Sequence, residues 1–413
     1  MAVGVVTLVV VIVVALGPDP PMYETLPALT IGEPAFVATV EAHLSTPVVG
    51  GNRVSVLLNG DEIFPAKLAA VRSARTSINY AEYFWAEGDV GRELADALAD
   101  RCRAGVPVKI LLDGVGTLYM PATHVATLQR AGCRVVSFRS LAGWDPRRHN
   151  YRNHRRILVI DGRLGISGGS GVSEKWAGDG RQDGHWRDTD IRVEGPAVAG
   201  LQAAFAENWR EATRELLGGP AYFPGPIAAA GDVRVQIVPS SPAGGSYAVY
   251  TMVLLAMASA KRSILMTNPY FVLDQRMTEA LLAAARRGVR VAALTPGKID
   301  HNLVRSASRR DFGRLLQGGV HIFEYQPALL HSKTLVVDGV WATIGSTNLD
   351  NRSFALNDEL NVAIHDARFA RRLQEIFERD LERARPVTYE QWRRRGLKER
   401  LMETLVFPVR DLL

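Results

Sequence analysis

Short apolar runs alternate with amphipathic stretches along most of the chain, a pattern typical of strands and helices following one another. In the first half, strands are expected at residues 53–58, 77–85, 108–112 and 134–138, and helices at 63–74, 91–104 and 125–132. In the second half, strands are expected at residues 233–238, 263–271, 289–294 and 320–325, and helices at 247–260, 278–287 and 306–317. This alternation predicts two α/β units.

The two halves also resemble each other locally. ARTSI at residues 74–78 matches AKRSI at 260–264, and RAGVPV at 103–108 matches RRGVRV at 286–291. The matching segments lie so far apart in the chain that the repeated unit is too long for a solenoid repeat. They therefore indicate an internal duplication. We therefore expect a first domain at 52–217, a Gly- and Pro-rich linker at 218–231, a second domain at 232–385 and a basic amphipathic tail at 386–413.

The N-terminus is strongly apolar. Residues 3–16 are almost wholly aliphatic, and no charged residue occurs between Ala2 and Pro18. As a helix this segment would span roughly 25 Å, slightly short of the ~30 Å hydrocarbon core of a bilayer. We expect residues 1–17 to be a membrane anchor and the Pro-rich residues 18–51 to be a connector. A buried Val-rich strand and the remnant of a longer anchor are the alternatives.

Composition narrows the class of protein. Hydrophobic residues make up 47% of the 413 positions and charged residues 22%, which excludes a disordered chain. The net charge of +6 and the pI near 9.4 favour anionic partners, whether phospholipid, nucleic acid or phosphorylated small molecules. The two cysteines, Cys102 and Cys133, are expected to be buried thiols, which is compatible with a reducing compartment.

The strongest chemical signal lies in the second half. His331 and Lys333 precede a buried apolar strand that ends at Asp338, and a Gly-Ser-Thr-Asn turn with Ser346 and Asn348 follows. Side chains alternate along a strand, so His331 and Lys333 share a face. An imidazole beside a cation suits an anionic centre that needs a nucleophile or a proton.

The first half carries a twin of this signal. His154, Arg156 and Asp161 lie 177 positions before their counterparts, again around an apolar strand that ends in Asp-Gly. Two matched histidines in two related halves indicate one site between the halves.

A phosphodiester explains why such a pair is useful. One imidazole can attack phosphorus and form a phosphohistidine while the other protonates the departing alcohol. Lys333 and Arg156 would hold the non-bridging oxygens, with Ser346 and Asn348 as further donors. Asp161 and Asp338 would fix the imidazole tautomers or tie the halves together. This scheme needs no metal or cofactor.

These motifs resemble those of the phospholipase D superfamily, in which HxKx4DG is followed by GSxN. The longer runs AEYFW, RNHR, HWRDTDIRVEGPAV and GSTNLDNRSFALNDELNV resemble the bacterial cardiolipin synthases, from about Asn52 to the C-terminus. The resemblance implies two pseudo-symmetric α/β/α sandwich domains with the active site at their interface. It also implies transfer of a phosphatidyl group from one phosphatidylglycerol to another, with release of glycerol.

The first motif departs from the family pattern at two positions. Arg156 occupies the lysine position and Gly171 the asparagine position. Arg keeps the charge but is not geometrically equivalent to Lys, and Gly removes a donor. The resemblance to the family implies that His154 is the nucleophile and His331 the acid and base. The residues themselves do not establish which histidine has which role.

Other features leave alternatives open. The basic residues before the first motif suit phosphate head groups or form a solvated loop: Arg147, Arg148, His149, Arg152 and Arg155. The loop at 178–188, with the nearby Trp176, is a lid or an ordinary surface loop. The tail is an interfacial helix or a helix that packs on the second domain.

Phospholipid substrates and a membrane are therefore the expected partners, and nucleic acid is not. We expect the protein at the cytoplasmic membrane with its catalytic domains in the cytoplasm. A phospholipase D-type hydrolase is the alternative, and a superfamily nuclease or a non-catalytic lipid-binding scaffold is less favoured.

Overall fold

A computed structural model describes residues 20–140, 150–299 and 302–406 of the 413-residue chain. The expected anchor at 1–17 lies outside these residues. Within the described ranges, no helix combines the length and apolarity that crossing a bilayer would require.

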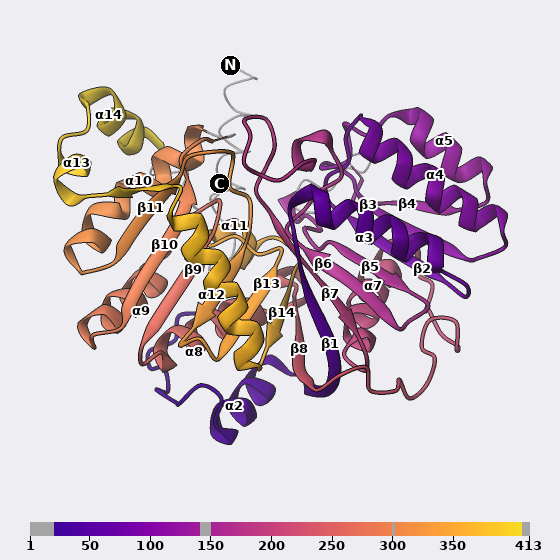
Figure 1. Ribbon diagram of the computed structural model, residues 1–413, viewed down its shortest axis with the longest axis horizontal. Helices are drawn as coiled ribbons and strands as arrows, with labels where there is room; N and C mark the ends of the chain where they lie inside the picture. Colours follow the sequence, from indigo (N-terminus) through magenta and orange to yellow (C-terminus); the bar gives the residue numbers. More distant parts are fainter. Residues whose placement is uncertain (1–19, 141–149, 300–301, 407–413) are drawn as a thin grey trace, which may run out of the picture.

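The first half begins earlier than expected and runs to residue 213 (Figure 1). Its elements are α2 (Pro34–Leu44), β1 (Val48–Leu58), α3 (Asn59–Ser73), β2 (Ile78–Glu82), α4 (Asp89–Arg103), β3 (Val108–Asp113), α5 (Ala122–Arg130), β4 (Arg134–Phe138), β5 (Ile157–Ile160), β6 (Leu164–Gly168), the 3-10 helix η1 (Glu174–Trp176), β7 (Thr189–Glu194) and α7 (Val198–Thr213).

The second half repeats this order and adds a C-terminal extension. Its elements are β8 (Val233–Ser240), η2 (Pro242–Gly244), α8 (Ala248–Ser259), β9 (Ser263–Thr267), α9 (Gln275–Arg286), β10 (Arg290–Pro296), α10 (Asn302–Gln317), β11 (His321–Tyr325), β12 (Thr334–Val337), β13 (Trp341–Gly345), α11 (Asn351–Ala355), β14 (Glu359–Ile364), α12 (Ala367–Leu381), β15 (Ala384–Val387), α13 (Tyr389–Arg393) and α14 (Leu397–Val406).

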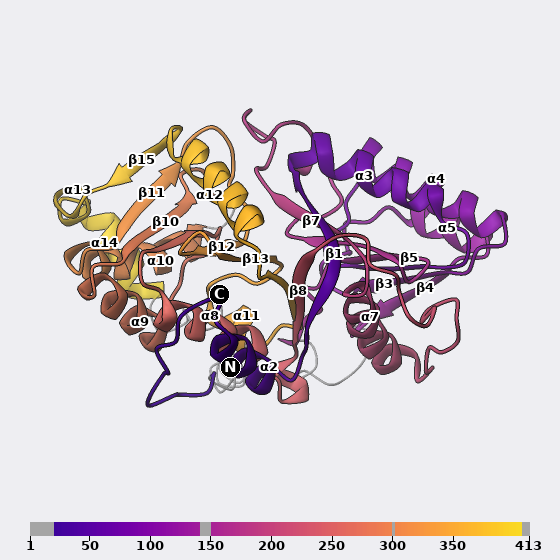
Figure 2. The ribbon, with the colours of Figure 1, turned by 60° about the horizontal axis from the view of Figure 1, so that its bottom comes forward.

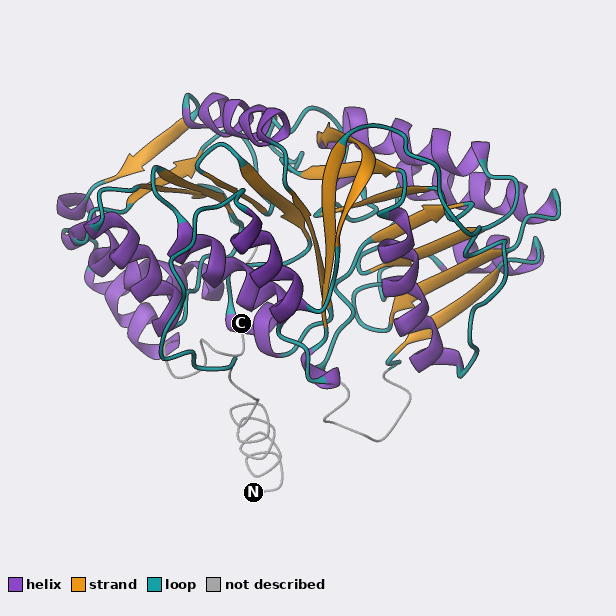
Figure 3. Cartoon of the chain, turned by 90° about the horizontal axis from the view of Figure 1, so that it is seen from below, coloured by secondary structure: helices purple, strands orange, loops and turns teal. Residues whose placement is uncertain are grey.

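The strands of both halves form one continuous sheet. Its order is β15-β11-β10-β9-β12-β13-β14-β8-β1-β7-β6-β5-β2-β3-β4. Counted outward from the central β8–β1 pair, equivalent strands of the two halves follow in the same order, and β15 is added at the edge of the second half. Strands β8 and β1 run antiparallel, with Val48 opposite Gln236 and Asn52 opposite Val233, and they lie side by side between the halves in Figure 2. Helices cover both faces of the strands (Figure 3). The predicted α/β class and the two related halves are confirmed.

Helix α12 shows how the sequence builds the interface between the halves. Asp366 caps its N-terminus by accepting the backbone N–H of Phe369. Phe369, Leu373 and Phe377 recur at helical spacing and are buried in a core cluster that also contains Trp209 of α7. One apolar core therefore joins both halves and holds the two motif-bearing strands in a fixed relation.

Residues 18–51 are not merely a connector. They contain α2 and the start of β1, and Phe36, Val40 and Leu44 of α2 pack into the core of the second half. The proline-rich composition predicted an extended chain, but these apolar side chains find a partner surface only in the folded second half, far along the sequence.

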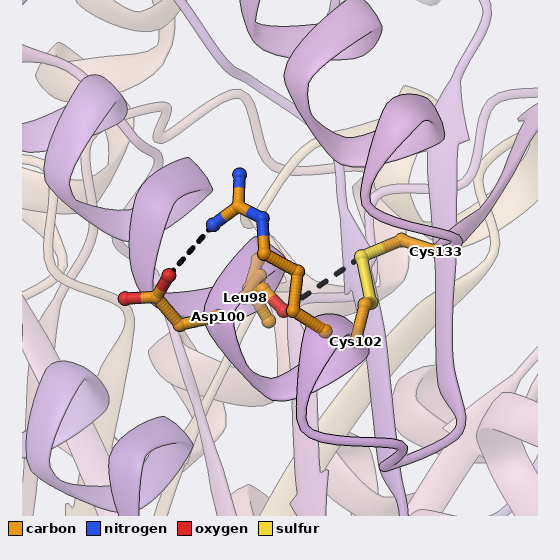
Figure 4. Close-up of a disulfide and its surroundings, with 5 residues drawn as sticks. Leu98, Asp100, Cys102 and Cys133 are labelled. Carbon is orange, nitrogen blue, oxygen red and sulfur yellow. Dashed lines mark hydrogen bonds and ion pairs between the residues drawn. A yellow bond between two sulfur atoms is a disulfide. The ribbon is translucent and has the colours of Figure 1, made fainter.

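The expectation of two free thiols is wrong. Cys102, near the end of α4, forms a disulfide with Cys133, immediately before β4, with a Cα–Cα distance of 5.5 Å (Figure 4). The two cysteines are 31 positions apart in sequence, and only the packing of α4 and α5 beside β4 brings them together.

Candidate active site

The two motif histidines occupy equivalent positions in the sheet. His154 precedes β5, which runs antiparallel to β2, so it lies at the carboxyl end of β2. His331 precedes β12, which runs antiparallel to β9 in the same way. Both residues are buried, and their side chains are 8% and 7% exposed. The structure thus brings the two predicted histidines to corresponding edges, as the duplication implied.

His154 is held by the second half of the chain. Its Nδ1 lies 2.9 Å from Oε1 of Glu359, and its backbone N–H donates to the carbonyl of Asp358 at 2.9 Å. The ring of Tyr83 packs edge-on against the imidazole at 4.7 Å. Because Nδ1 faces the carboxylate, Nε2 is the nitrogen left for chemistry.

His331 is held by the first half in the same manner. Its Nδ1 lies 2.7 Å from Oδ2 of Asp188, and its backbone N–H donates to the carbonyl of Arg187 at 2.7 Å. The rings of Trp176 and Trp186 each lie 5.2 Å from the imidazole and 4.4 Å from each other. Each histidine is therefore oriented by a carboxylate of the opposite half.

Sequence reasoning missed both carboxylates. Asp188 immediately precedes β7 and Glu359 begins β14, which are the strands that follow the Gly-rich turn in each half. That shared position, an acid at the start of the same strand in both repeats, was a signal that could have identified them.

A cation accompanies each histidine, as predicted. Nζ of Lys333 lies 2.8 Å from Nδ1 and 3.0 Å from Nε2 of His331, and Nη2 of Arg156 lies 3.2 Å from Nε2 of His154. Lys333 and Arg156 are 2% and 3% exposed, so their charges act in a medium of low dielectric. The guanidinium of Arg156 also stacks over Tyr83 at 5.5 Å. A buried cation beside each imidazole is an arrangement that can hold an anionic group such as a phosphate.

Burial and the neighbouring cations lower the pKa of both imidazoles. The pKa of His154 falls to about 4 through burial and the charge of Arg156, with Glu359 opposing the shift. The pKa of His331 falls to about 4 through burial and the charge of Lys333. Both rings are therefore neutral at pH 7 before substrate binds, and an anion placed between the cations would raise both pKa values.

The two carboxylates stay ionised despite burial. For Asp188, burial opposes ionisation, but His331, Lys333 and the indole of Trp176 together hold its pKa well below the usual range. For Glu359, burial again opposes ionisation, and His154 and nearby hydroxyls lower its pKa. Anionic carboxylates behind neutral imidazoles stabilise the imidazolium that forms during proton transfer.

The expected role of Asp161 and Asp338 at the imidazoles is wrong. Asp161 accepts hydrogen bonds from the backbone N–H groups of residues 75–77 and from the Thr76 hydroxyl. Asp338 accepts the backbone N–H groups of residues 261–263. All these partners lie within the same half, at the end of β5 or β12 opposite the histidine. Both residues have positive φ, +55° and +56°, and each stabilises the turn at the end of its strand by binding the backbone of a neighbouring loop.

Ser346 and Asn348 differ in their availability for phosphate. The Ser346 hydroxyl donates to Oε2 of Glu359, and its oxygen accepts the Leu360 N–H at 3.0 Å. It therefore positions the carboxylate behind His154. The side-chain oxygen of Asn348 is buried and has no hydrogen-bond partner among the described residues, but an amide oxygen accepts and does not donate. Phosphate binding by Asn348 would have to use its NH2 group and stays a prediction.

The basic approach to His154 is partly structural. The side chain of Arg155 donates to the carbonyls of Ala204, Ser240 and Glu359, and it pairs with Glu207, so it ties the halves together. Arg152 lies 3.5 Å from the carboxylate of Asp113. The stretch 141–149, which holds the other basic residues, lies outside the described residues. Among the described residues, no cluster of three His, Cys, Asp or Glu side chains could hold a metal ion.

Comparison with known proteins places this geometry in a family. The family described as "Cardiolipin synthase, PLD-like domain" matches residues 68–209 and 253–381. "Cardiolipin synthase A" of Pseudomonas fluorescens is 36% identical over 348 residues, which are 84% of this chain and 72% of that protein. "Cardiolipin synthase 1" of Bacillus cereus is 32% identical over 375 residues, 89% of this chain and 74% of that protein.

Solved structures show the same fold. A phosphatidylserine synthase from Haemophilus influenzae superposes with a TM-score of 0.68 over 91% of this chain and 100% of its own, at 12% identity. At that identity the likeness concerns the fold alone.

Proposed function

Because this chain belongs to the phospholipase D superfamily, on its cardiolipin synthase branch, we propose that it is a phosphatidyltransferase. It joins two phosphatidylglycerol molecules into cardiolipin and releases glycerol. The observation that carries this proposal is the pair of buried histidines, each with a cation at Nε2 and a carboxylate of the opposite half at Nδ1.

The first step forms a covalent intermediate. Nε2 of His154 attacks the phosphorus of the first phosphatidylglycerol, an N–P bond forms, and the P–O bond to the head-group glycerol breaks. His331, protonated while phosphate is bound, gives its proton to the departing glycerol oxygen. Arg156 and Lys333 neutralise the charge that develops on the non-bridging oxygens.

The second step reverses the proton transfer. His331, now neutral, takes the proton from the head-group hydroxyl of a second phosphatidylglycerol, and that oxygen attacks phosphorus as the N–P bond breaks. Asp188 and Glu359 keep both Nε2 atoms directed at the phosphate throughout. The assignment of His154 as nucleophile follows the family pattern, since the two sets are too alike for geometry to order them.

Helix α14 supports contact with a membrane. Leu397, Leu401 and Leu405 are four residues apart and are 83%, 60% and 62% exposed, which makes one apolar stripe. The opposite side of α14 packs on α10, with Val406 buried against Val304. The tail therefore packs on the second half, and contact of its exposed stripe with a membrane is part of the proposal. With Lys398 and Arg400 beside the stripe, this face suits an anionic phospholipid surface.

The test is a product analysis with purified protein. The protein is incubated with phosphatidylglycerol in mixed micelles, and the lipids are identified by mass spectrometry. Cardiolipin and glycerol support the proposal, phosphatidic acid alone would indicate a hydrolase, and no turnover would indicate a lipid-binding scaffold. DNA cleavage in a parallel reaction would indicate a nuclease.

Three variants locate the chemistry. His154→Ala and His331→Ala should each abolish product, whereas His321→Ala, which removes an exposed histidine on β11, should not. With a radiolabelled phosphatidyl donor whose leaving group needs no proton, such as p-nitrophenol, label should accumulate on the His331→Ala protein and not on the His154→Ala protein. Labelling of the His154→Ala protein instead would reverse the assignment of nucleophile and acid.

A further inference from the structure

The Gly-rich turn of the first half lacks two polar side chains that its twin possesses. Counting 177 positions back, Gly169 corresponds to Ser346 and Gly171 to Asn348. In the second half the Ser346 hydroxyl donates to the carboxylate behind His154. A hydroxyl at the equivalent place would be needed to do the same for the carboxylate behind His331.

The space that these side chains would occupy is filled by other groups. A Cβ at Gly169 would lie 2.3 Å from Oδ1 of Asp188, so the carboxylate would have to move away from its place behind His331. A Cβ at Gly171 would lie 3.1 Å both from Phe84 and from Cη2 of Trp176. The glycines therefore make room for the short carboxylate and for a large indole.

The indole of Trp176 supplies the missing donor. Trp176 lies on η1 and is 2% exposed, and its Nε1 donates to Oδ2 of Asp188 at 2.8 Å. The same oxygen is 2.7 Å from Nδ1 of His331. The indole and imidazole rings also meet edge to face, with an interplanar angle of 86°.

The second half places a donor at the matching position. Residue 353, which is 177 positions after Trp176, is Ser353 on α11, and its side chain helps to lower the pKa of Glu359. The short helices η1 and α11 begin alike, because Ser173 caps the first and Asp350, again 177 positions later, caps the second. The donor position is thus common to both repeats, although the side chains differ in size.

We propose that Trp176 is a positioning residue for His331, whose indole N–H holds the Asp188 carboxylate in place of the serine donors of the second half. The first motif is then a rearranged version of the second and has not decayed. The role of His331 as acid and base rests on the proposed function, whereas the donor contact does not.

Two physical consequences follow from this contact. The indole fixes the oxygen that receives Nδ1–H, so Nε2 of His331 is directed at the substrate. It also withdraws negative charge from the carboxylate. Without the indole N–H, Asp188 would bind the imidazolium form more strongly, and the pKa of His331 would rise.

Two variants separate the donor from the ring. Trp176→Phe keeps an aromatic ring and removes the N–H, whereas Trp176→His keeps a five-membered ring with an N–H at the position of the indole nitrogen. Trp176→Phe should lower kcat about tenfold, the effect of losing one hydrogen bond to a charged group, with little change in KM. Trp176→His, assayed at pH 8, should retain more of kcat than Trp176→Phe.

The direct readout is the pKa of His331, measured by NMR with 13C-labelled histidine and no lipid. It should rise in Trp176→Phe. Trp85→Phe is the matched control, because Trp85 is buried in the same half and its indole nitrogen has no hydrogen-bond partner among the described residues. That variant should leave the pKa of His331 unchanged.

Several outcomes would overturn the proposal. These are an unchanged pKa of His331 in Trp176→Phe, a greater loss in Trp176→His than in Trp176→Phe, or a rise in KM alone. If neither variant folds, the indole 15N–1H signal of Trp176 in the wild type should shift as His331 titrates, and a signal indifferent to that titration would refute the contact. A wild type without phosphatidyl transfer would refute the proposed function, yet the His331 pKa comparison would still test the positioning role.

Discussion

The hydroxyl of Ser346 is hydrogen-bonded to Glu359, the carboxylate that holds His154, and to the carbonyl of Leu360. It is therefore not free to bind phosphate. Ser346→Ala should therefore lower kcat about tenfold, since a hydrogen bond to a charged group is lost. The KM for phosphatidylglycerol should stay close to that of the wild type. Steady-state kinetics in mixed micelles measure both quantities. A raised KM with an unchanged kcat would instead support the phosphate-binding role that the motif predicts.

Asp338 contributes to stability and not to the chemical step. Asp338→Asn keeps a residue that tolerates positive φ but weakens the bonds from residues 261–263. The free energy of unfolding should fall by about 2 kcal/mol, while kcat per folded molecule should be unchanged. Urea denaturation and activity measurements on the same samples test this. Asp188→Asn is the contrasting variant, because it should abolish activity.

His365 should make the fold sensitive to acid. It packs between Phe36 and Trp341, and burial together with the charge of Arg234 lowers its pKa to about 4. The unfolded chain binds a proton near pH 6.5 and the folded chain does not, so stability is complete above that pH and is lost as the pH falls towards 4.

Replacing His365 should remove this loss. Between pH 7 and pH 5, the unfolding free energy of His365→Phe should gain about 2 kcal/mol relative to the wild type. His154 and His331 remain in both proteins, so their contribution to acid sensitivity cancels. Denaturation curves at the two pH values measure the difference, and parallel losses in both proteins would show that His365 is not responsible.

Single residues of the site could be predicted from the sequence where a reactive residue type recurs at the same spacing in both halves. His154, Arg156, His331 and Lys333 could be found because each pair precedes a buried strand at the same spacing. The carboxylates that hold the imidazoles are 205 and 143 positions away in the chain, and their one sequence signal is an acid at the start of the equivalent strand in both repeats. The hydrophobic pattern contains no information about which acid will cross the interface.

Among the elements, regular helices and central strands were predictable and edge elements were not. Strands β2, β3, β9 and β10 are buried on both faces, and short apolar runs such as ILM in β9 and VAAL in β10 mark such strands in the sequence. By contrast, β15 is a short edge strand with a proline, formed only because it can pair with β11. Its position is determined by tertiary contact and leaves no periodic signal.

The apolar stripe of α14 should matter only when the substrate is in a bilayer. Leu401→Ser with Leu405→Ser should reduce turnover on phosphatidylglycerol vesicles about tenfold, since each leucine would otherwise bury part of its surface in lipid. Turnover in mixed micelles should be unchanged. Leu216→Ser, which replaces an equally exposed leucine after α7, is the control. Equal rates on vesicles for all variants would remove α14 from the membrane contact.

For the molecule as a whole, the duplication predicted two related halves, and the structure adds how they depend on each other. The β8–β1 pair joins the sheets, and a single core cluster contains both α7 and α12. Asp188 of the first half binds His331 of the second, and Glu359 of the second half binds His154 of the first. Neither half holds a complete site, so the symmetry visible in the sequence understates the coupling between the halves.

The disulfide bears on the side of the membrane that the catalytic halves occupy. The sequence favoured the cytoplasm and free thiols, but cytosolic reductants keep thiols reduced, and a persistent disulfide indicates an oxidising compartment. Cys102 and Cys133 are paired in the structure, so we expect the cross-link to form in cells and the catalytic halves to lie on the oxidising side. This expectation departs from the orientation inferred from sequence, and it can be tested directly.

The measurement is alkylation in intact cells. Cells are denatured in the presence of an alkylating reagent, and the mass of the protein is measured with and without prior reduction. We expect both cysteines to react only after reduction, and the Cys102→Ser, Cys133→Ser double variant not to react at all. Because the cross-link closes a loop with a sequence separation of 31, that variant should also unfold with about 3–4 kcal/mol less free energy. Alkylation of both thiols without reductant would instead place the catalytic halves in the cytoplasm. In that case the double variant and the wild type isolated from cells should have the same free energy of unfolding, because neither contains the cross-link.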